Sequence, residues 1–243
     1  MIGNVKELIK AHEGLKREVY LDIENGGVVA NEVLESMLPY FNQRGYGNPT
    51  LTHKPGWEAY ETIIESTQKI AGFLGCKNIE EINFTPGETE ANNLALLGST
   101  LKMRGRNKKI VISQVEPLSV TYAAEMLKEY GFSVVKIPVD NEGFINLQKL
   151  EESVDRDTVI VSISTVNHEI GTVQPIKKAV SIVKSKNTEV IFHTDASDAY
   201  GKIPFNVEDL DVDLATVSSY KILGPRGIGA LYVKEGVNVE GIL

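Results

Sequence analysis

Short apolar stretches alternate with longer amphipathic ones along most of the chain. The short stretches are rich in β-branched residues and almost continuously apolar, which is typical of strands covered on both faces of a sheet. In the longer segments the apolar residues recur at helical spacing. The pattern predicts strands at residues 81–85, 109–114, 133–139, 158–165, 189–196, 214–219 and 227–233, and helices at residues 89–103, 118–131, 147–154 and 176–186.

This alternation predicts the α/β class, and within it a three-layer α/β/α sandwich with a mostly parallel central sheet. No repeat, low-complexity tract or linker rich in proline, glycine or serine interrupts the sequence. In open α/β sheets, ligands bind at the carboxyl ends of the strands. We therefore expect the chemistry of this protein in the loops that follow its predicted strands.

Composition and charge narrow the classes of partner. The 243 residues include 33 acidic and 25 basic ones, for a formal charge of −8, and no basic run stands out. Nucleic acid and anionic membrane are therefore not expected as partners. No apolar stretch approaches the roughly 18 to 20 residues that span a bilayer, and the first residues lack the apolar centre of a signal peptide. These features predict a cytoplasmic protein.

The cysteine and histidine content predicts neither a disulfide nor a metal site. Cys76 is the only cysteine, which excludes an internal disulfide and a site with several cysteine ligands. The four histidines share no metal-ligand spacing. We interpret Cys76, near the end of a surface helix, as a small packing residue.

A first candidate for chemistry is the segment FTPGETEANN. Here a predicted strand is followed by a Pro86–Gly87 turn and by a helix that begins near Thr89. Free backbone N–H groups and the positive end of a helix dipole favour an anion such as phosphate at this place. The alternative is an ordinary helix start, in which Glu88 and Glu90 complement the dipole.

Two further candidates follow later strands. Asp195 comes at the end of a strand expected to be buried, where a carboxylate needs a cationic or hydrogen-bonding partner; a structural cap or a metal ligand is the alternative. Lys221 follows another strand, among Ser218, Ser219 and Tyr220. It is placed to act as a nucleophilic amine, although most lysines are simply solvated cations. An anion site, a carboxylate and an amine together match the needs of pyridoxal 5′-phosphate.

The chain resembles the class V aminotransferase family, and within it most of all the cysteine desulfurases. The resemblance covers nearly the whole chain in the family's order, and its most distinctive segments are NHEIGTVQPI and KILGPRGIGALYV. It implies the large domain of the fold-type-I transferases that use pyridoxal phosphate. In this interpretation residues 1–20 form an N-terminal helical segment and residues 21–243 the cofactor-binding domain.

The resemblance also implies roles for individual residues. Lys221 aligns with the lysine that forms a Schiff base with the cofactor, and Asp195 with the carboxylate that keeps the pyridinium nitrogen protonated. Thr89 and Ser218 match phosphate-binding hydroxyls, and Gly87 gives the turn beneath the phosphate, next to Glu88. Asn167 and His168 match a segment near the substrate, so that Lys221, Asp195 and His168 are the expected catalytic residues.

Several positions around the expected cofactor depart from the family's pattern. Pro117 stands where the desulfurases have a histidine over the cofactor ring, and proline cannot transfer a proton. His168 replaces an asparagine, and Tyr220 replaces the histidine before the lysine. Asp198 replaces a glutamine that would donate a hydrogen bond to the ring oxygen, which an ionised carboxylate would instead repel. We still expect Pro117, Asp198 and Tyr220 to line the cofactor site.

The resemblance ends before the small C-terminal domain, which in the family carries the persulfide-forming cysteine and the arginine that binds the substrate carboxylate. We therefore expect a cysteine desulfurase-like protein, acting in sulfur transfer from L-cysteine or a similar amino acid, that is incomplete without this domain. A homodimer is expected, and a second polypeptide could supply the missing part. The alternatives are an aminotransferase or lyase acting on another amino acid, and a non-catalytic binding or assembly module.

Overall fold

A single seven-stranded sheet forms the centre of the protein in the computed structural model, which describes residues 19–101 and 108–242. The strand order is β1-β7-β6-β5-β4-β2-β3. All neighbours pair in parallel except β7, which lies between β1 and β6 and runs antiparallel to both. The strands are β1 (Ile82–Thr85), β2 (Lys109–Ser113), β3 (Ser133–Ile137), β4 (Thr158–Ser162), β5 (Ile191–Asp195), β6 (Leu214–Ser218) and β7 (Gly229–Val233).

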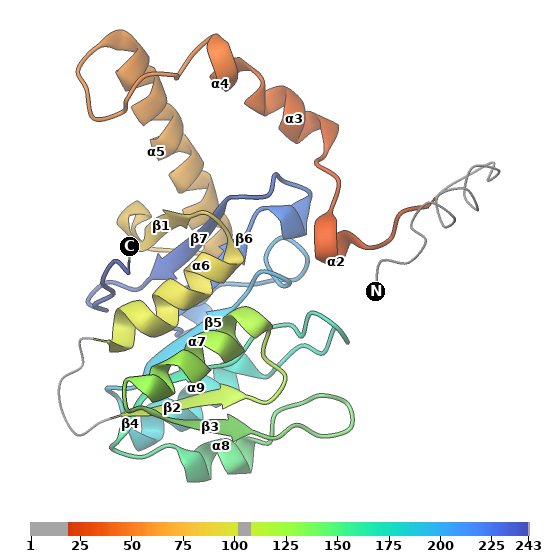
Figure 1. Cartoon of the computed structure of the whole chain (residues 1–243), viewed down its shortest axis with the longest axis vertical. Coiled ribbons are helices and arrows are strands. Elements are labelled where there is room, and N and C mark those ends of the chain that lie inside the picture. Colours follow the sequence, from red (N-terminus) through yellow and green to blue (C-terminus); the bar gives the residue numbers. More distant parts are fainter. Residues whose placement is uncertain (1–18, 102–107, 243) are drawn as a thin grey trace.

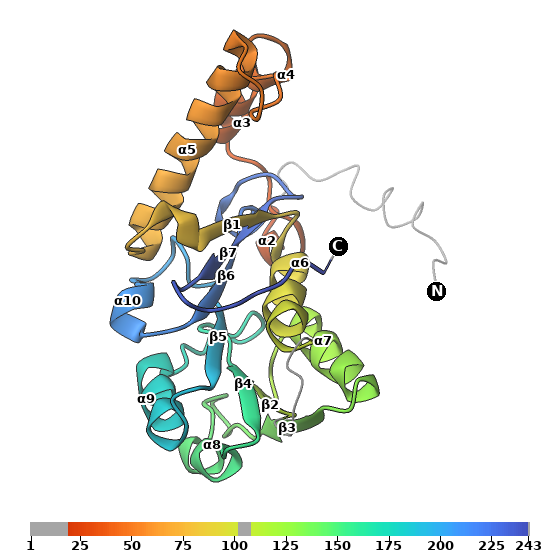
Figure 2. The ribbon, with the colours of Figure 1, turned by 90° about the vertical axis from the view of Figure 1, so that its left-hand side faces the viewer.

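Helices cover both faces of this sheet, as Figure 2 shows. The apolar side chains separate accordingly into two cores, one under α6 and α7 and the other under α8, α9, α10 and the end of α5. The predicted three-layer α/β/α sandwich with a mostly parallel sheet is confirmed. The longer helices are α5 (Lys54–Leu74), α7 (Leu118–Glu129) and α9 (Ile176–Lys186), and the shorter ones are α2 (Ile23–Gly26), α3 (Asn31–Met37), α4 (Pro39–Asn42), α6 (Glu88–Asn93), α8 (Leu147–Ser153) and α10 (Val207–Leu210).

The alternation of side chains along the strands explains the two cores. On β2, Ile110 and Ile112 point to the core under α6 and α7, whereas Val111 points to the opposite core. The same alternation places Phe192 of β5 opposite Ile191. Because both faces are covered, apolar residues follow one another without alternation in strands such as β2 and β4, which is the pattern that made the strands visible in the sequence.

The predicted helix at residues 89–103 begins as α6 and continues through a π-helical turn, η2 (Leu94–Gly98). Its last two predicted residues lie outside the described residues. Only the end of the longest helix, α5, was predicted, as the surface helix that ends near Cys76; its start was not. Its start has a proline in the first turn and a cap in which Gly56 N–H donates to His53 Nδ1, and Gly75 ends it in the left-handed conformation.

Helices α3 and α4 and the start of α5 stand at one end of the molecule, beyond the sheet, whereas the end of α5 packs against the sheet (Figure 1). Several of their large apolar side chains face solvent, including Phe41, Trp57 and Tyr60. Of the expected helical segment at 1–20, residues 1–18 lie outside the described residues, and the last two belong to no helix. In the part of the chain that the structure describes, no helix is long and apolar enough to cross a bilayer.

Candidate functional site

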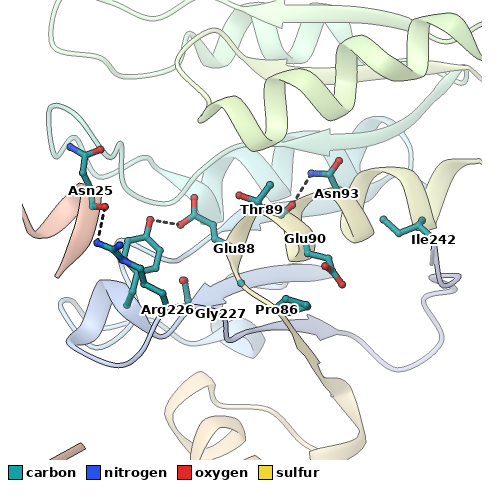
Figure 3. Close-up of a pocket in the computed structure, with 12 residues that line it drawn as sticks. Asn25, Pro86, Glu88, Thr89, Glu90, Asn93, Arg226, Gly227 and Ile242 are labelled. Carbon is teal, nitrogen blue, oxygen red and sulfur yellow. Dashed lines mark hydrogen bonds between the residues drawn. The ribbon is translucent and has the colours of Figure 1, made fainter. Parts of the chain in front are cut away.

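The carboxyl ends of β1 and β6 border a cavity of about 650 Å³. Figure 3 shows it beside the first turn of α6, with Glu88 and Thr89 on one side and Arg226 on another. Five predicted site residues line the cavity, namely Gly87, Glu88, Thr89, Ser218 and Tyr220. Residues that sequence reasoning did not single out, Asn25 and Arg226 among them, also contribute to its wall.

The turn between β1 and α6 depends on Gly87. Its φ of 148° lies in the region that residues with a side chain rarely adopt, so a glycine is needed here. The backbone of Gly87 also lies close to Gly229 at the start of β7, where an added Cβ atom would come within 2.9 Å of the Gly87 carbonyl carbon. Two glycines therefore let the turn sit tightly against the sheet.

Two buried hydroxyl groups near this edge have no partner. The Ser218 Oγ, at the end of β6, and the Ser197 Oγ have no hydrogen-bond partner among the described residues. Ser218 is only 2% exposed, yet it borders the cavity. Because a buried polar group without a partner is costly, Ser218 is suited to a polar group of a ligand in that cavity.

Asp195, the last residue of β5, is buried and held by two donors. Its Oδ2 accepts a hydrogen bond from Asn92 Nδ2 at 2.7 Å, and its Oδ1 accepts one from the Ser197 backbone N–H at 2.9 Å. Burial raises the pKa of Asp195, and the nearby negative charge of Asp198 adds to this, whereas the two hydrogen bonds oppose it. A cation brought to this carboxylate would be strongly favoured.

Lys221 is not a solvated cation. It is 3% exposed and lies in the 3₁₀ turn η3 (Tyr220–Ile222), which follows β6. Its Nζ donates to Asp198 Oδ2 at 3.1 Å and lies 5.2 Å from the centre of the Tyr220 ring. The turn ends at Leu223 in the left-handed conformation, with Gly224 N–H donating to Ser219 O at 3.0 Å.

Tyr220 extends the site toward the cavity. Its hydroxyl lies 3.4 Å from Glu88 Oε2, across the space between η3 and α6 (Figure 3). Two positions that sequence reasoning placed near the phosphate therefore contact each other. A carboxylate at this place would oppose an anion, whereas the tyrosine hydroxyl can donate to one.

A second buried carboxylate, Glu116, connects the loop before α7 to the loop after β4. Its oxygens accept from the Ser164 backbone N–H at 2.9 and 3.1 Å, and Oε2 accepts from Ser164 Oγ at 2.6 Å. Burial raises the pKa of Glu116 to about 8, although the Ser164 hydrogen bonds act in the opposite direction. Sequence reasoning missed Glu116; the signal available was an acidic residue directly after a buried strand.

The remaining predicted residues lie in these two loops. Asn167 connects them, since its Nδ2 donates to Val115 O at 3.0 Å and its Oδ1 accepts from the Glu169 and Ile170 N–H groups. His168 follows it and is half-buried, and Pro117 caps the start of α7. None of the three lines the cavity described above. Their predicted roles toward a cofactor or substrate stay predictions.

Asn92 is a further residue that sequence reasoning missed. It lies on α6, one turn after Glu88, and contacts Asp195 and Ser119 through Nδ2. It is fully buried, and its Oδ1 has no partner among the described residues. An asparagine on the buried face of a helix needs a polar partner, which is the signal that the sequence offered.

The family model and the relatives that this chain matches belong to the same kind of protein. The family model described as class V aminotransferase matches residues 19–240. The cysteine desulfurase IscS of Dictyoglomus turgidum is 39% identical over 229 residues, which are 94% of this chain and 57% of that protein. The human cysteine desulfurase is 40% identical over 225 residues, 92% of this chain and 48% of that protein. The chain thus spans about half the length of the curated relatives it matches.

A solved structure shows the same likeness in its fold. That of a NifS-like protein superposes with a TM-score of 0.90 at 37% identity, covering 93% of this chain and 62% of that one.

Proposed function

The chain belongs to the class V aminotransferase family, and on this premise we propose that it binds pyridoxal 5′-phosphate at Lys221 and acts in sulfur transfer from L-cysteine. The observation that carries the proposal is the burial of Lys221 at the same edge of the sheet as Asp195 and Ser218. A buried amine, a buried carboxylate and a buried hydroxyl with no partner in the described part of the chain match three different groups of this cofactor.

The residues present fit the cofactor group by group. The Ser218 and Thr89 hydroxyls, with the turn at Gly87, would hold the phosphate in the cavity. The Asp195 carboxylate, held by Asn92, would face the ring nitrogen. When bound, pyridoxal phosphate supplies a ring that accepts electrons from the α-carbon of an amino acid. Burial of Asp195 strengthens its attraction for a cationic nitrogen, because the surrounding protein screens charge poorly.

Two residues of the cavity would have to adjust to a phosphate. The Tyr220 hydroxyl would move from Glu88 to a phosphate oxygen, and Arg226, at the cavity wall, would offset the charge of Glu88. We therefore propose Tyr220 as a phosphate donor in this chain. Glu88 and Glu90 are the lining residues whose charge opposes the anion.

The desulfurase activity is proposed from the relatives, as is L-cysteine as substrate. A solved structure entitled SspA in complex with cysteine matches 93% of this chain with a TM-score of 0.88 at 32% identity, and this chain covers 65% of it. We further propose a homodimer, to which the exposed aromatic side chains of α4 and α5 would contribute, and a second polypeptide or domain that completes the site. A cytoplasmic location, expected from the sequence, is also a proposal.

A second candidate function keeps the cofactor but changes the chemistry. It is favoured by one observation, the carboxylate of Asp198 on Lys221 where the family has a neutral glutamine. An aminotransferase or lyase acting on another amino acid would fit such a change. Comparing the absorbance change that L-cysteine and other amino acids produce in the cofactor-loaded protein separates the two candidates.

Covalent attachment tests the proposed cofactor site. The purified chain is incubated with pyridoxal phosphate, reduced with borohydride and mapped by peptide mass spectrometry. We expect about one cofactor per chain, on the peptide that contains Lys221, and none in Lys221→Ala. Labelling at another lysine, or no labelling with excess cofactor, would contradict the proposal and favour a non-catalytic binding or assembly module.

A further inference from the structure

Asp198 bridges two lysines with very different surroundings. Its Oδ2 lies 3.1 Å from Lys221 Nζ and its Oδ1 lies 2.8 Å from Lys202 Nζ. The Lys221 side chain is 2% exposed, that of Asp198 13% and that of Lys202 43%. One carboxylate therefore connects a buried amine to an amine at the surface.

The surroundings of Lys221 favour its charged form. A buried ammonium group needs a counter-charge, and Asp198 supplies one within hydrogen-bond distance. The face of the Tyr220 ring, 5.2 Å from Nζ, attracts a cation as well. Burial alone would raise the pKa of Asp198, but its hydrogen bonds to Lys202 and Lys221 lower it, so that it remains a carboxylate at neutral pH.

Attachment of a carbonyl compound needs the opposite form of the amine. The ammonium group must first release a proton to water. The lone pair of the neutral amine then forms a bond to the carbonyl carbon, and the carbonyl oxygen leaves as water when the C=N bond is complete. A carboxylate that stabilises the ammonium form opposes the first of these events.

We propose that Asp198 is a positioning residue that holds the Lys221 amine charged and in place until a carbonyl compound arrives, and that Lys202 sets the strength of this hold. Lys202 weakens the hold because it shares the same carboxylate. The identity of the carbonyl compound, pyridoxal phosphate, rests on the proposed function. The inference also explains how a carboxylate is tolerated where the family has glutamine, since its charge is balanced by two lysines.

Reductive methylation of the cofactor-free chain tests the proposal directly. Formaldehyde is small, it forms the same kind of C=N bond, and cyanoborohydride fixes the product. The rate at Lys221 is followed by peptide mass spectrometry at one neutral pH, relative to the exposed Lys69 in the same sample. The variants are Asp198→Asn, Lys202→Gln and, as a matched control on an exposed lysine, Lys177→Gln.

The two informative variants should change the rate in opposite directions. We expect Asp198→Asn to raise the relative rate at Lys221 at least about fivefold, because an adjacent opposite charge favours the charged form by about tenfold or more. Lys202→Gln should lower it about twofold, since Asp198 then pairs with Lys221 alone. Lys177→Gln should leave it unchanged. A merely structural role for Asp198 would loosen the site and raise the rate in both variants.

The assay can contradict the inference on Asp198 without testing the proposed cofactor function. A rate in Asp198→Asn that is equal to or below the wild-type rate, or a faster rate in Lys202→Gln, would overturn the inference. The methylation assay needs no cofactor. If the methylation rates follow the expected order but pyridoxal phosphate is not fixed at Lys221, the proposed function fails while the inference stands.

Discussion

Replacing Glu116 by glutamine should change how the stability of the protein depends on pH. Glu116 is buried and its pKa is raised from 4.5 to about 8, so the folded state binds a proton that the unfolded state releases near pH 4.5. The free energy of unfolding therefore gains its full contribution from this group at low pH and loses it as the pH rises toward 8. Glutamine keeps the shape and an acceptor for the Ser164 N–H group but cannot ionise.

The magnitude follows from the two pKa values. A difference of about 3.5 between them corresponds to about 5 kcal/mol, at 1.36 kcal/mol for each pKa unit. About 3.5 kcal/mol of this is lost between pH 5 and pH 8, with a slope near 1.4 kcal/mol per pH unit in the middle of the range.

Urea unfolding from pH 5 to pH 8 measures the effect in both proteins. The difference in unfolding free energy, wild type minus Glu116→Gln, should fall steadily with pH by about 3 to 4 kcal/mol. Groups that titrate alike in both proteins cancel in this difference. A difference that changes by less than about 1 kcal/mol over the whole range would refute the reasoning, because Glu116 would then be ionised in the folded protein at pH 5.

Four further predictions concern the cavity, the buried carboxylate, the reactivity of the single thiol and the release of sulfide. Ser218→Ala should weaken pyridoxal phosphate binding about tenfold, measured by fluorescence titration. Its stability in urea should be unchanged, because the Ser218 Oγ has no partner among the described residues to lose. Lower stability with unchanged cofactor binding would contradict the role of Ser218 in binding. Asn92→Ala should lower the unfolding free energy by about 1 to 3 kcal/mol, since Asp195 loses a donor, and an unchanged urea midpoint would speak against that hydrogen bond. Burial raises the pKa of Cys76 to about 12, so a thiol reagent at pH 8 should react at least about a hundredfold more slowly with the folded than with the urea-unfolded chain. Because the half-buried Cys76 thiol stays protonated and cannot act as a nucleophile, the 243-residue chain on its own should not release sulfide from L-cysteine at an enzymatic rate. Robust release that is lost in Cys76→Ser would overturn the interpretation of Cys76 as a packing residue.

The sequence predicted the sheet well because its strands are buried on both faces. Every predicted strand is present, and in a strand such as β4 the residues from Val159 to Val161 are consecutive, apolar and buried. The prediction placed only the end of a surface helix near Cys76 and gave no start for α5, although the apolar residues of α5 recur at helical spacing as clearly as those of α9. The proline near the start of α5 and Gly75 at its end were local signals that would have located it.

The candidate site was predictable in its positions but not in its contacts. Gly87, Asp195 and Lys221 were singled out because they follow predicted strands. Their partners depend on pairs far apart in sequence, such as Asn92 with Asp195 at a separation of 103 residues. The contact between Asp198 and Lys221 likewise spans 23 residues and one strand, so no local pattern indicates it. Only the packed sheet brings these side chains together.

The antiparallel position of β7 has a consequence for the order in which the protein folds. Strand β1 pairs only with β7 in the sheet order, and Thr85 pairs with Gly229, far along the chain. During synthesis, β2 to β6 can assemble into a parallel sheet before the residues of β7 emerge, whereas β1 must wait for them. The turn at Gly87 directly follows β1, so the cavity wall is completed late. Until β7 is made, β1 has no partner in the sheet and the edge of β6 is open. The nascent chain therefore depends on slow, non-local strand pairing and is exposed to aggregation.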